Sequence, residues 1–218
     1  MVKKNCFSSQ FDNKDVTLES QTRVYDGFFK LEEVAFKHAL FAGGESQLVK
    51  RELLERGDAV AVLPYDPKLN RLVFIEQLRI GAMRTKSSPW LLEVVAGMID
   101  KPESAKEVAI REAEEEAGLH IERLIPMLSY LSSPGGTSER LYLFLGIVDS
   151  SQAGWVHGLD DEQEDIKVHV IDYPESLSLL QQGVIDNAAA VICLQWLALN
   201  KECIDKEIRD KELEEKNT

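Results

Sequence analysis

The sequence has 218 residues, of which 44% are hydrophobic, enough for one large domain or for one domain with a small appendage. There are 38 acidic residues and 25 basic ones, so the net charge is -13. A surface of this sign excludes non-specific binding to nucleic acids and to anionic membranes. A small anionic substrate stays compatible with it, because a divalent metal and a few arginines can reverse the local field.

The cysteines and the start of the chain bear on location. The three cysteines at positions 6, 193 and 203 have neither the spacing of a metal site nor that of a disulfide framework, which suits a reducing compartment. No apolar run follows the two lysines near the start, and no window is long and apolar enough to span a bilayer. We therefore expect a cytoplasmic protein.

In chain order, the pattern predicts many strands and few helices. Residues 1–20 are polar and are predicted to be loosely ordered. Strands are predicted at residues 28–36, 38–41, 46–51, 59–65, 71–78, 90–96, 141–148 and 166–171. Helices are predicted at residues 104–117, 174–182 and 187–200. A helix that follows a strand among many strands indicates an α/β sandwich with a mixed sheet.

The helix at residues 104–117 has clear start and stop signals. Ser104 is a good N-cap, and Glu107 three residues later completes a capping box. Pro102 cannot continue a helix backwards, and Gly118 is a natural stop.

This helix carries a cluster of carboxylates. Glu112 and Glu116 are one turn apart, and Glu115 flanks them, so three like charges gather on one side. Such oxygen-rich clusters suit Mg²⁺ or Mn²⁺. Taken alone, the acidic run is more typical of a solvent-exposed acidic helix face than of a metal site. Arg111 on the same helix is predicted to pair with Glu103 and to lock the preceding loop against the helix.

The complete spacing around this helix is more specific than the acidic run. It reads G-x5-E-x7-R-E-U-x-E-E-x-G-U, where U is a bulky or aliphatic residue, and only Ala113 is small for its position. The pattern is filled by Gly97, Glu103, Arg111, Glu112, Ala113, Glu115, Glu116, Gly118 and Leu119. This spacing resembles the signature of the Nudix hydrolase superfamily. The resemblance implies an α/β/α sandwich with a mixed β-sheet, preceded here by an N-terminal β-rich segment.

The resemblance also implies roles for individual residues. Glu112 and Glu116 would be metal ligands supported by Glu115, with the backbone carbonyl of Ala96 and the late acid Glu164 as further ligands. Two or three Mg²⁺ ions are implied, with Mn²⁺ as an alternative. Glu162 would be the general base, although Asp160, Asp161 and Asp165 are close by. The structural positions of the motif are Gly97, Glu103, Arg111 and Gly118.

From about residue 25 to residue 200 the chain is similar to bacterial ADP-ribose pyrophosphatases. The similarity is carried by WLLEVVAGMID, SSPGGTSER, DEQEDIKVHV and IDNAAAVICLQWL. It implies hydrolysis of ADP-ribose to AMP and ribose 5-phosphate by a homodimer whose N-terminal strands cross to the partner. The substrate contacts it implies are Phe28, Phe29, Arg51, Glu52, Arg56, Arg79, Met98, Pro134, Gly135 and Glu139. Arginine forks suit phosphates, and aromatic rings suit a purine face.

Several alternatives stay open at this point. The arginines could be surface residues, Phe28 and Phe29 could belong to the core, and Glu139 could pair with Arg140. The substrate could be another nucleoside diphosphate sugar or a dinucleotide, or the chain could be a non-catalytic nucleotide-binding module or an acidic interaction protein. The predicted organisation is an N-terminal segment at residues 1–56 for dimerisation and adenine contacts, a Nudix domain at 57–200, and a charged tail at 201–218. That tail is predicted to be either a solvated helix extension or disordered.

Overall fold

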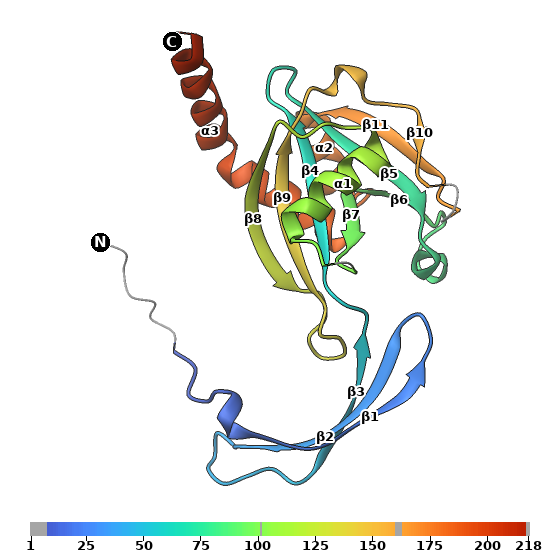
Figure 1. Ribbon diagram of the computed structural model, residues 1–218, viewed down its shortest axis with the longest axis vertical. Helices are drawn as coiled ribbons and strands as arrows, with labels where there is room; N and C mark the ends of the chain where they lie inside the picture. Colours follow the sequence, from blue (N-terminus) through green and yellow to red (C-terminus); the bar gives the residue numbers. More distant parts are fainter. Residues whose placement is uncertain (1–7, 101, 160–162, 217–218) are drawn as a thin grey trace. The chain divides into compact units, whose positions relative to one another are not determined.

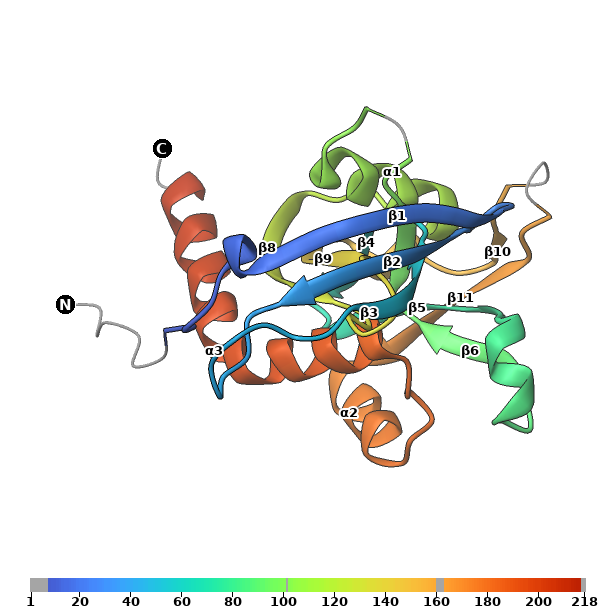
Figure 2. The same ribbon diagram turned by 90° about the horizontal axis from the view of Figure 1, so that it is seen from below.

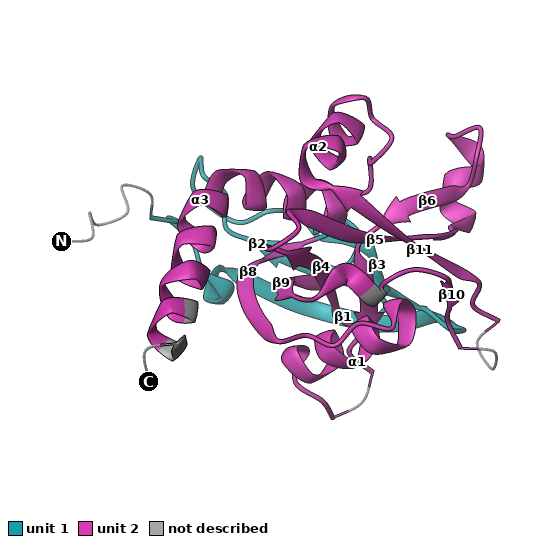
Figure 3. Cartoon of the chain, turned by 90° about the horizontal axis from the view of Figure 1, so that it is seen from above, with its two compact units in different colours: residues 1–56, 132–139 teal, residues 57–131, 140–218 magenta. Residues whose placement is uncertain are grey.

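A computed structural model describes residues 8–100, 102–159 and 163–216 (Figure 1). The chain divides into two compact units (Figure 3). The first comprises residues 1–56 and 132–139, and the second comprises residues 57–131 and 140–218.

The second unit is built around an eight-stranded mixed sheet. Its strands are β4 (Ala59–Asp66), β5 (Arg71–Leu78), β6 (Trp90–Glu93), β7 (Val95–Met98), β8 (Arg123–Leu131), β9 (Arg140–Ile147), β10 (Val156–His157) and β11 (Ile166–Asp172). The main order is β10-β11-β5-β4-β9-β8, while β6 pairs with β5 and β7 pairs with β4. Strands β4 and β9 are parallel, and the other pairs are antiparallel.

Helices cover both faces of this sheet (Figures 1 and 2). Helix α1 (Ala105–Ala117) lies on one face, and α2 (Tyr173–Gln181) and α3 (Ala188–Lys216) lie on the other. Short 3-10 helices follow β5 at Ile80–Arg84 and β9 at Ser150–Gln152. The predicted α/β/α sandwich with a mixed sheet is confirmed. None of the helices within the described residues is long and apolar enough to cross a membrane.

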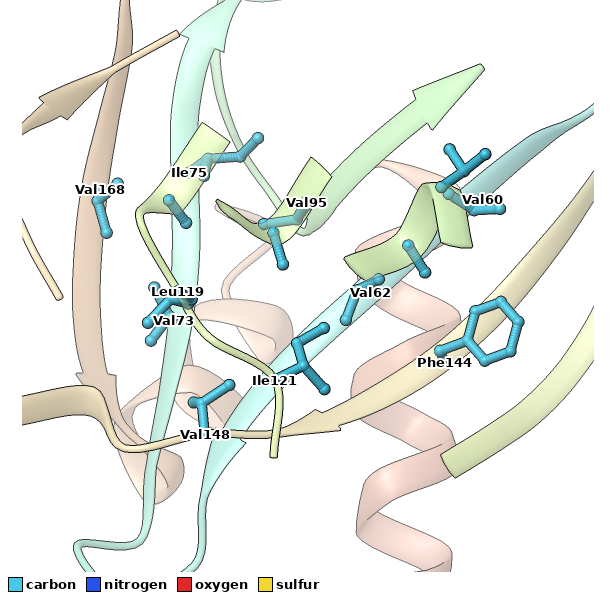
Figure 4. Packing of buried hydrophobic residues seen from close by; sticks show 14 of the residues in the cluster. Val60, Val62, Val73, Ile75, Val95, Leu119, Ile121, Phe144, Val148 and Val168 are labelled. Carbon is cyan, nitrogen blue, oxygen red and sulfur yellow. The ribbon is translucent and has the colours of Figure 1, made fainter. Parts of the chain in front are cut away.

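Strand alternation divides the core into two clusters, one on each face. On β4, Val60 and Val62 point toward α1, while Ala61 and Leu63 point toward α3. Figure 4 shows the α1 side, where valine and isoleucine side chains of β4, β5, β7 and β11 pack together. Helix α1 meets them with Val108 and with the small residues Ala109, Ala113 and Ala117, all fully buried or nearly so. Small residues let α1 pack closely on the sheet, and this close packing positions the carboxylates of α1 next to β7.

The first unit is a three-stranded antiparallel sheet of β1 (Val16–Asp26), β2 (Lys30–His38) and β3 (Val49–Glu55), preceded by a 3-10 helix at Asn13–Asp15. The prediction of loose order is therefore wrong from Asn13 onward. Strand β1 is exposed along its whole length, so it has no buried face whose alternation could have marked it in the sequence.

Other elements also differ from the predictions. The predicted strand at residues 90–96 is two strands, because β6 pairs with β5 and β7 pairs with β4. The predicted strand at residues 38–41 is wrong, since β2 ends at His38. Strand β8 was missed. The charged tail is helical through Lys216, so of its two predicted forms the helix extension is confirmed, although Ile204 within it is buried rather than solvated.

Candidate active site

Local capping fixes the position of α1. The Ser104 hydroxyl accepts a hydrogen bond from the Glu107 backbone N–H, and the Glu107 carboxylate accepts one from the Ser104 N–H at 2.7 Å. Gly118 ends the helix at φ 62°, a left-handed conformation that favours glycine. These contacts satisfy both ends of the helix and fix which residues face the sheet.

Arg111 binds three acidic residues at once. Its guanidinium lies 3.3 Å from Glu103, 2.9 Å from Glu112 and 2.8 Å from Glu115. The predicted pairing with Glu103 is confirmed, and it ties the loop before α1 to the middle of the helix. Arg111 also partly balances the charge of the carboxylate cluster.

The two predicted metal ligands on α1 lie against β7. Glu116 is only 4% exposed, and its Oε2 accepts a hydrogen bond of 3.0 Å from the Ala96 N–H. The Glu112 side chain covers Gly97 so closely that an added Cβ would lie 2.0 Å from Glu112 Oε1. A side chain at Gly97 would therefore have to displace the Glu112 carboxylate. Met98, a predicted substrate contact, follows on β7 opposite Ala59.

The carboxylates of this site repel one another in a buried setting. Burial raises the pKa of Glu116 to about 8, against the opposing hydrogen bond from Ala96, and the charges of Glu112 and Glu164 raise it further. Burial likewise raises the pKa of Glu112 to about 7, with Arg111 opposing and with Glu115 and Glu164 adding to the shift. The charge of Glu164 therefore acts on both α1 carboxylates.

The late acidic loop is described in part. Glu164 is half-buried, and its Oε2 accepts a hydrogen bond of 3.3 Å from the Leu159 N–H. The predicted general base Glu162 lies outside the described residues, as do the nearby Asp160 and Asp161. Asp165 is described and is exposed.

The donor set fits a hard divalent cation. Its side-chain donors are carboxylate oxygens, and burial, reinforced by neighbouring carboxylates, raises the pKa of both Glu112 and Glu116 and so disfavours their charged forms. A cation would stabilise their charged forms, and oxygen ligands are those that Mg²⁺ and Mn²⁺ prefer. Within the described residues, no three acidic, histidine or cysteine side chains converge closely enough to hold an ion between them. Glu112 and Glu115 are turned toward Arg111, and Glu116 toward Ala96.

An ion pair missed in the sequence lies on the same face of the sheet. Arg79, at the end of β5, donates a hydrogen bond of 2.7 Å from its Nε to Glu93 Oε2 on β6. The Glu93 side chain is 13% exposed. Burial raises its pKa, and Arg79 opposes that shift. A lone acid within the apolar run WLLEVV carries no motif, so only the pairing of β5 with β6 reveals this contact.

The first unit brings four of the predicted substrate contacts together. The Arg56 guanidinium lies 5.1 Å from the centroid of the Phe29 ring, and its Nε lies 3.0 Å from Glu139 Oε1, without hydrogen-bond alignment. Glu139 is buried and pairs with Arg56, so the alternative pairing with Arg140 is wrong. Phe28 packs edge-on against Phe29 and is 82% exposed, which rules out a core role in this unit.

The remaining contacts predicted in the first unit lie on its surface. Arg51 and Glu52 are exposed on β3, and Arg51 donates to the backbone carbonyl of Lys50. Pro134 and Gly135 lie in an exposed turn closed by the hydrogen bond from Gly136 N–H to the Ser133 carbonyl. These residues are accessible to a ligand.

Substituting Gly97 tests the close approach of Glu112. Gly97→Ala is expected to displace the Glu112 carboxylate and to lower metal-dependent turnover by at least about tenfold, since misplaced catalytic groups lose rate steeply. Because the group that must move is a flexible side chain, the melting temperature should change little. Gly81→Ala is the matched control, since nothing lies within 4 Å of an added Cβ there. Equal turnover by the two variants would contradict the assignment of Glu112, packed over Gly97, to the metal site.

Comparison with known proteins assigns the fold and the sequence motif to the same protein family. The NUDIX domain family matches residues 55–188, which is more than half of the sequence, and the chain belongs to this family. The chain is 48% identical over 207 residues to the ADP-ribose pyrophosphatase of Escherichia coli (strain K12), covering 95% of this chain and 99% of that protein.

Two further relatives and one structure complete the comparison. The chain is 50% identical to the ADP-ribose pyrophosphatase of Haemophilus influenzae, covering 87% of this chain and 89% of that protein. It is 36% identical to the GDP-mannose pyrophosphatase of Cronobacter sakazakii, covering 72% and 81%. A crystal structure of an ADP compounds hydrolase shares the fold, with a TM-score of 0.67, 20% identity, and coverage of 89% of this chain and 98% of that one.

Proposed function

We propose that this protein hydrolyses the diphosphate bond of ADP-ribose to AMP and ribose 5-phosphate, with Mg²⁺ as the metal. The observation that carries the proposal is the buried carboxylate pair of α1, Glu112 and Glu116, held against β7 over Gly97. Identities of 48% and 50% to ADP-ribose pyrophosphatases over most of the chain support this substrate over GDP-mannose, for which the identity is 36%.

The chain's own residues supply binding, orientation and proton transfer. Glu112, Glu116, Glu164 and the Ala96 carbonyl would hold two or three ions, with Glu115 supporting them through Arg111. When bound, the metal neutralises the diphosphate and stabilises the charge that builds on the leaving phosphate. Glu162 accepts the proton of the attacking water as one P–O bond forms and the bridging P–O bond breaks. Arg51, Arg56 and Arg79 orient the substrate, and Phe28 and Phe29 stack on adenine.

A substrate panel tests this proposal. Purified protein with Mg²⁺ is incubated with ADP-ribose, GDP-mannose, NADH and other diphosphate substrates, and release of the nucleoside monophosphate is scored. The expected result is metal-dependent release of AMP with the highest kcat/KM for ADP-ribose. Preferential turnover of GDP-mannose or NADH would transfer the proposal to that substrate, and tight ADP-ribose binding without turnover would favour a non-catalytic binding module.

The proposed assembly is a homodimer in which the N-terminal strands complete the partner's adenine pocket. Strand β1 is wholly exposed and includes Val16, Leu18, Val24 and Tyr25, each between 47% and 62% exposed. A three-stranded sheet with so much apolar surface calls for a partner. The proposal locates the protein in the cytoplasm, in line with its cysteine usage.

Mixing two inactive variants tests this assembly. Phe28→Ala/Phe29→Ala lacks the adenine contacts, and Glu116→Gln lacks a metal ligand, so a crossed dimer of the two has one intact site. After subunit exchange, about a quarter of all sites should be intact, and activity should return. A fully active protein with a monomeric mass by light scattering would refute the dimer. A dimer whose mixed variants stay inactive would mean that the adenine contacts and the metal ligands of each site come from the same chain.

A further inference from the structure

One ion pair lies beside the carboxylate cluster, between the half-exposed Arg79 and the largely buried Glu93, and Glu93 has no role in the proposed mechanism. Residues 75, 77 and 79 share one face of β5 and its extension, and Ile75 packs in the cluster beneath α1. Glu93 on β6 is directly opposite Ile75 in the strand register, so it shares that face. Glu93 and Arg79 therefore meet on the side of the sheet that carries Glu116.

The pair holds Arg79 in one place. The Arg79 backbone N–H donates a hydrogen bond of 2.8 Å to the Pro89 carbonyl, and its Nε donates one of 2.7 Å to Glu93. Within the described residues the Arg79 side chain makes no other hydrogen bond, so its terminal nitrogens stay available. Its positive charge is close enough to lower the pKa of Glu116. A two-pronged donor beside a metal-type carboxylate cluster matches a phosphate group.

A second polar group on this face lacks a protein partner. Gln77 is two residues before Arg79 and is 8% exposed. Its amide Nε2 is buried and has no hydrogen-bond partner in the part of the chain that the structure describes. Buried donors are normally satisfied, so an unpaired one next to Arg79 indicates that a ligand oxygen completes this face.

We propose that Glu93 is a positioning residue that orients the Arg79 guanidinium toward the substrate diphosphate. The inference rests on the proposed function. A largely buried carboxylate is costly to keep for stability alone. A pair of the same kind at the other end of β5 has an equally exposed arginine but an exposed acid. There, Arg71 Nε lies 2.9 Å from Asp172 Oδ1, with side chains 45% and 61% exposed. That pair serves as the control.

The test is a double-mutant cycle in kinetics. Glu93→Gln keeps the shape and removes the charge, and it is expected to raise the KM for ADP-ribose about tenfold with kcat within about twofold, because it loosens a group that binds substrate and transition state alike. Arg79→Ala should raise KM at least as much. In the Arg79→Ala background, Glu93→Gln should add nothing, since Glu93 acts through Arg79. Asp172→Asn should match the wild type.

Several outcomes of this cycle would decide against the role proposed for Glu93. The inference would be overturned if the KM effects of Glu93→Gln and Arg79→Ala were additive, or if Glu93→Gln left KM unchanged or lowered it. It would also be overturned if calorimetry showed weaker Mg²⁺ binding in Glu93→Gln, because Glu93 would then be a metal ligand. If Glu93→Gln does not fold, Glu93→Asp should give a smaller KM increase that also vanishes in the Arg79→Ala background. Wild-type protein without activity on ADP-ribose would instead refute the proposed function.

Discussion

Replacing Glu116 with glutamine is expected to lower ADP-ribose turnover by at least about a hundredfold, since a metal ligand contributes several kcal/mol to transition-state stabilisation. The fold should persist, because glutamine keeps an oxygen that can accept the Ala96 N–H. In EDTA at pH 8.5 this variant should even be more stable than the wild type, since it lacks a buried, crowded carboxylate. Steady-state kinetics and urea unfolding measure the two effects.

The matched control is Glu114→Gln on the same helix. Glu114 is exposed on α1, whereas Glu116 is 4% exposed. Both substitutions remove one negative charge from α1, so a general effect of charge would appear in both variants. Normal turnover in Glu116→Gln, or equal losses in the two variants, would mean that Glu116 is not a metal ligand.

The free energy of unfolding in EDTA is expected to fall as the pH rises from about 5 to about 8. Glutamate has an ordinary pKa of 4.5, and the folded-state values are about 8 for Glu116 and about 7 for Glu112. Between these pH values the folded state retains protons that the unfolded state has lost, so stability decreases with pH. Each pKa unit corresponds to about 1.4 kcal/mol, so Glu116 alone accounts for a loss on the order of 4 kcal/mol.

Saturating Mg²⁺ should reverse this trend. Binding requires the deprotonated carboxylates, so metal affinity and the added stability grow with pH. Acids with lowered pKa values, such as Asp66, lose their stabilising effect only below their ordinary pKa of 3.8, outside this window. Urea unfolding at several pH values with EDTA or Mg²⁺ makes the measurement. Glu116→Gln should flatten the EDTA profile, and an equally steep profile in that variant would contradict the account.

Local signals in the sequence predicted the elements that carry the chemistry. Ser104, Glu107 and Gly118 define the ends of α1 through interactions within one turn, so the helix was placed to within one residue. The Arg111–Glu103 contact was likewise predicted, because a loop and the helix that follows it are close in sequence. The motif spacing implied that Gly97 lies near the carboxylates, but only the structure shows that a side chain there would displace the Glu112 carboxylate.

Non-local pairings could not be predicted in the same way. Residues 90–96 form one apolar run, yet the run divides at Val94 between two partner strands. Strand β8 contains Pro126 and a register shift between Pro126 and Ser129, which an edge strand tolerates but which obscures its pattern. The contact of Arg79 with Glu93 depends on the register of β5 with β6. The pairing of Arg56 with Glu139 joins residues far apart in the chain.

The central claim is that the carboxylates of α1 gather divalent metal where the diphosphate is split. The most direct measurement is a crystal structure with Mg²⁺ and an analogue of ADP-ribose whose bridging oxygen is a methylene group. The account predicts an ion bound by Glu112, Glu116 and the Ala96 carbonyl, in contact with the diphosphate oxygens. Carboxylates that still face Arg111 and Ala96, with the analogue bound elsewhere and no ion beside them, would contradict it.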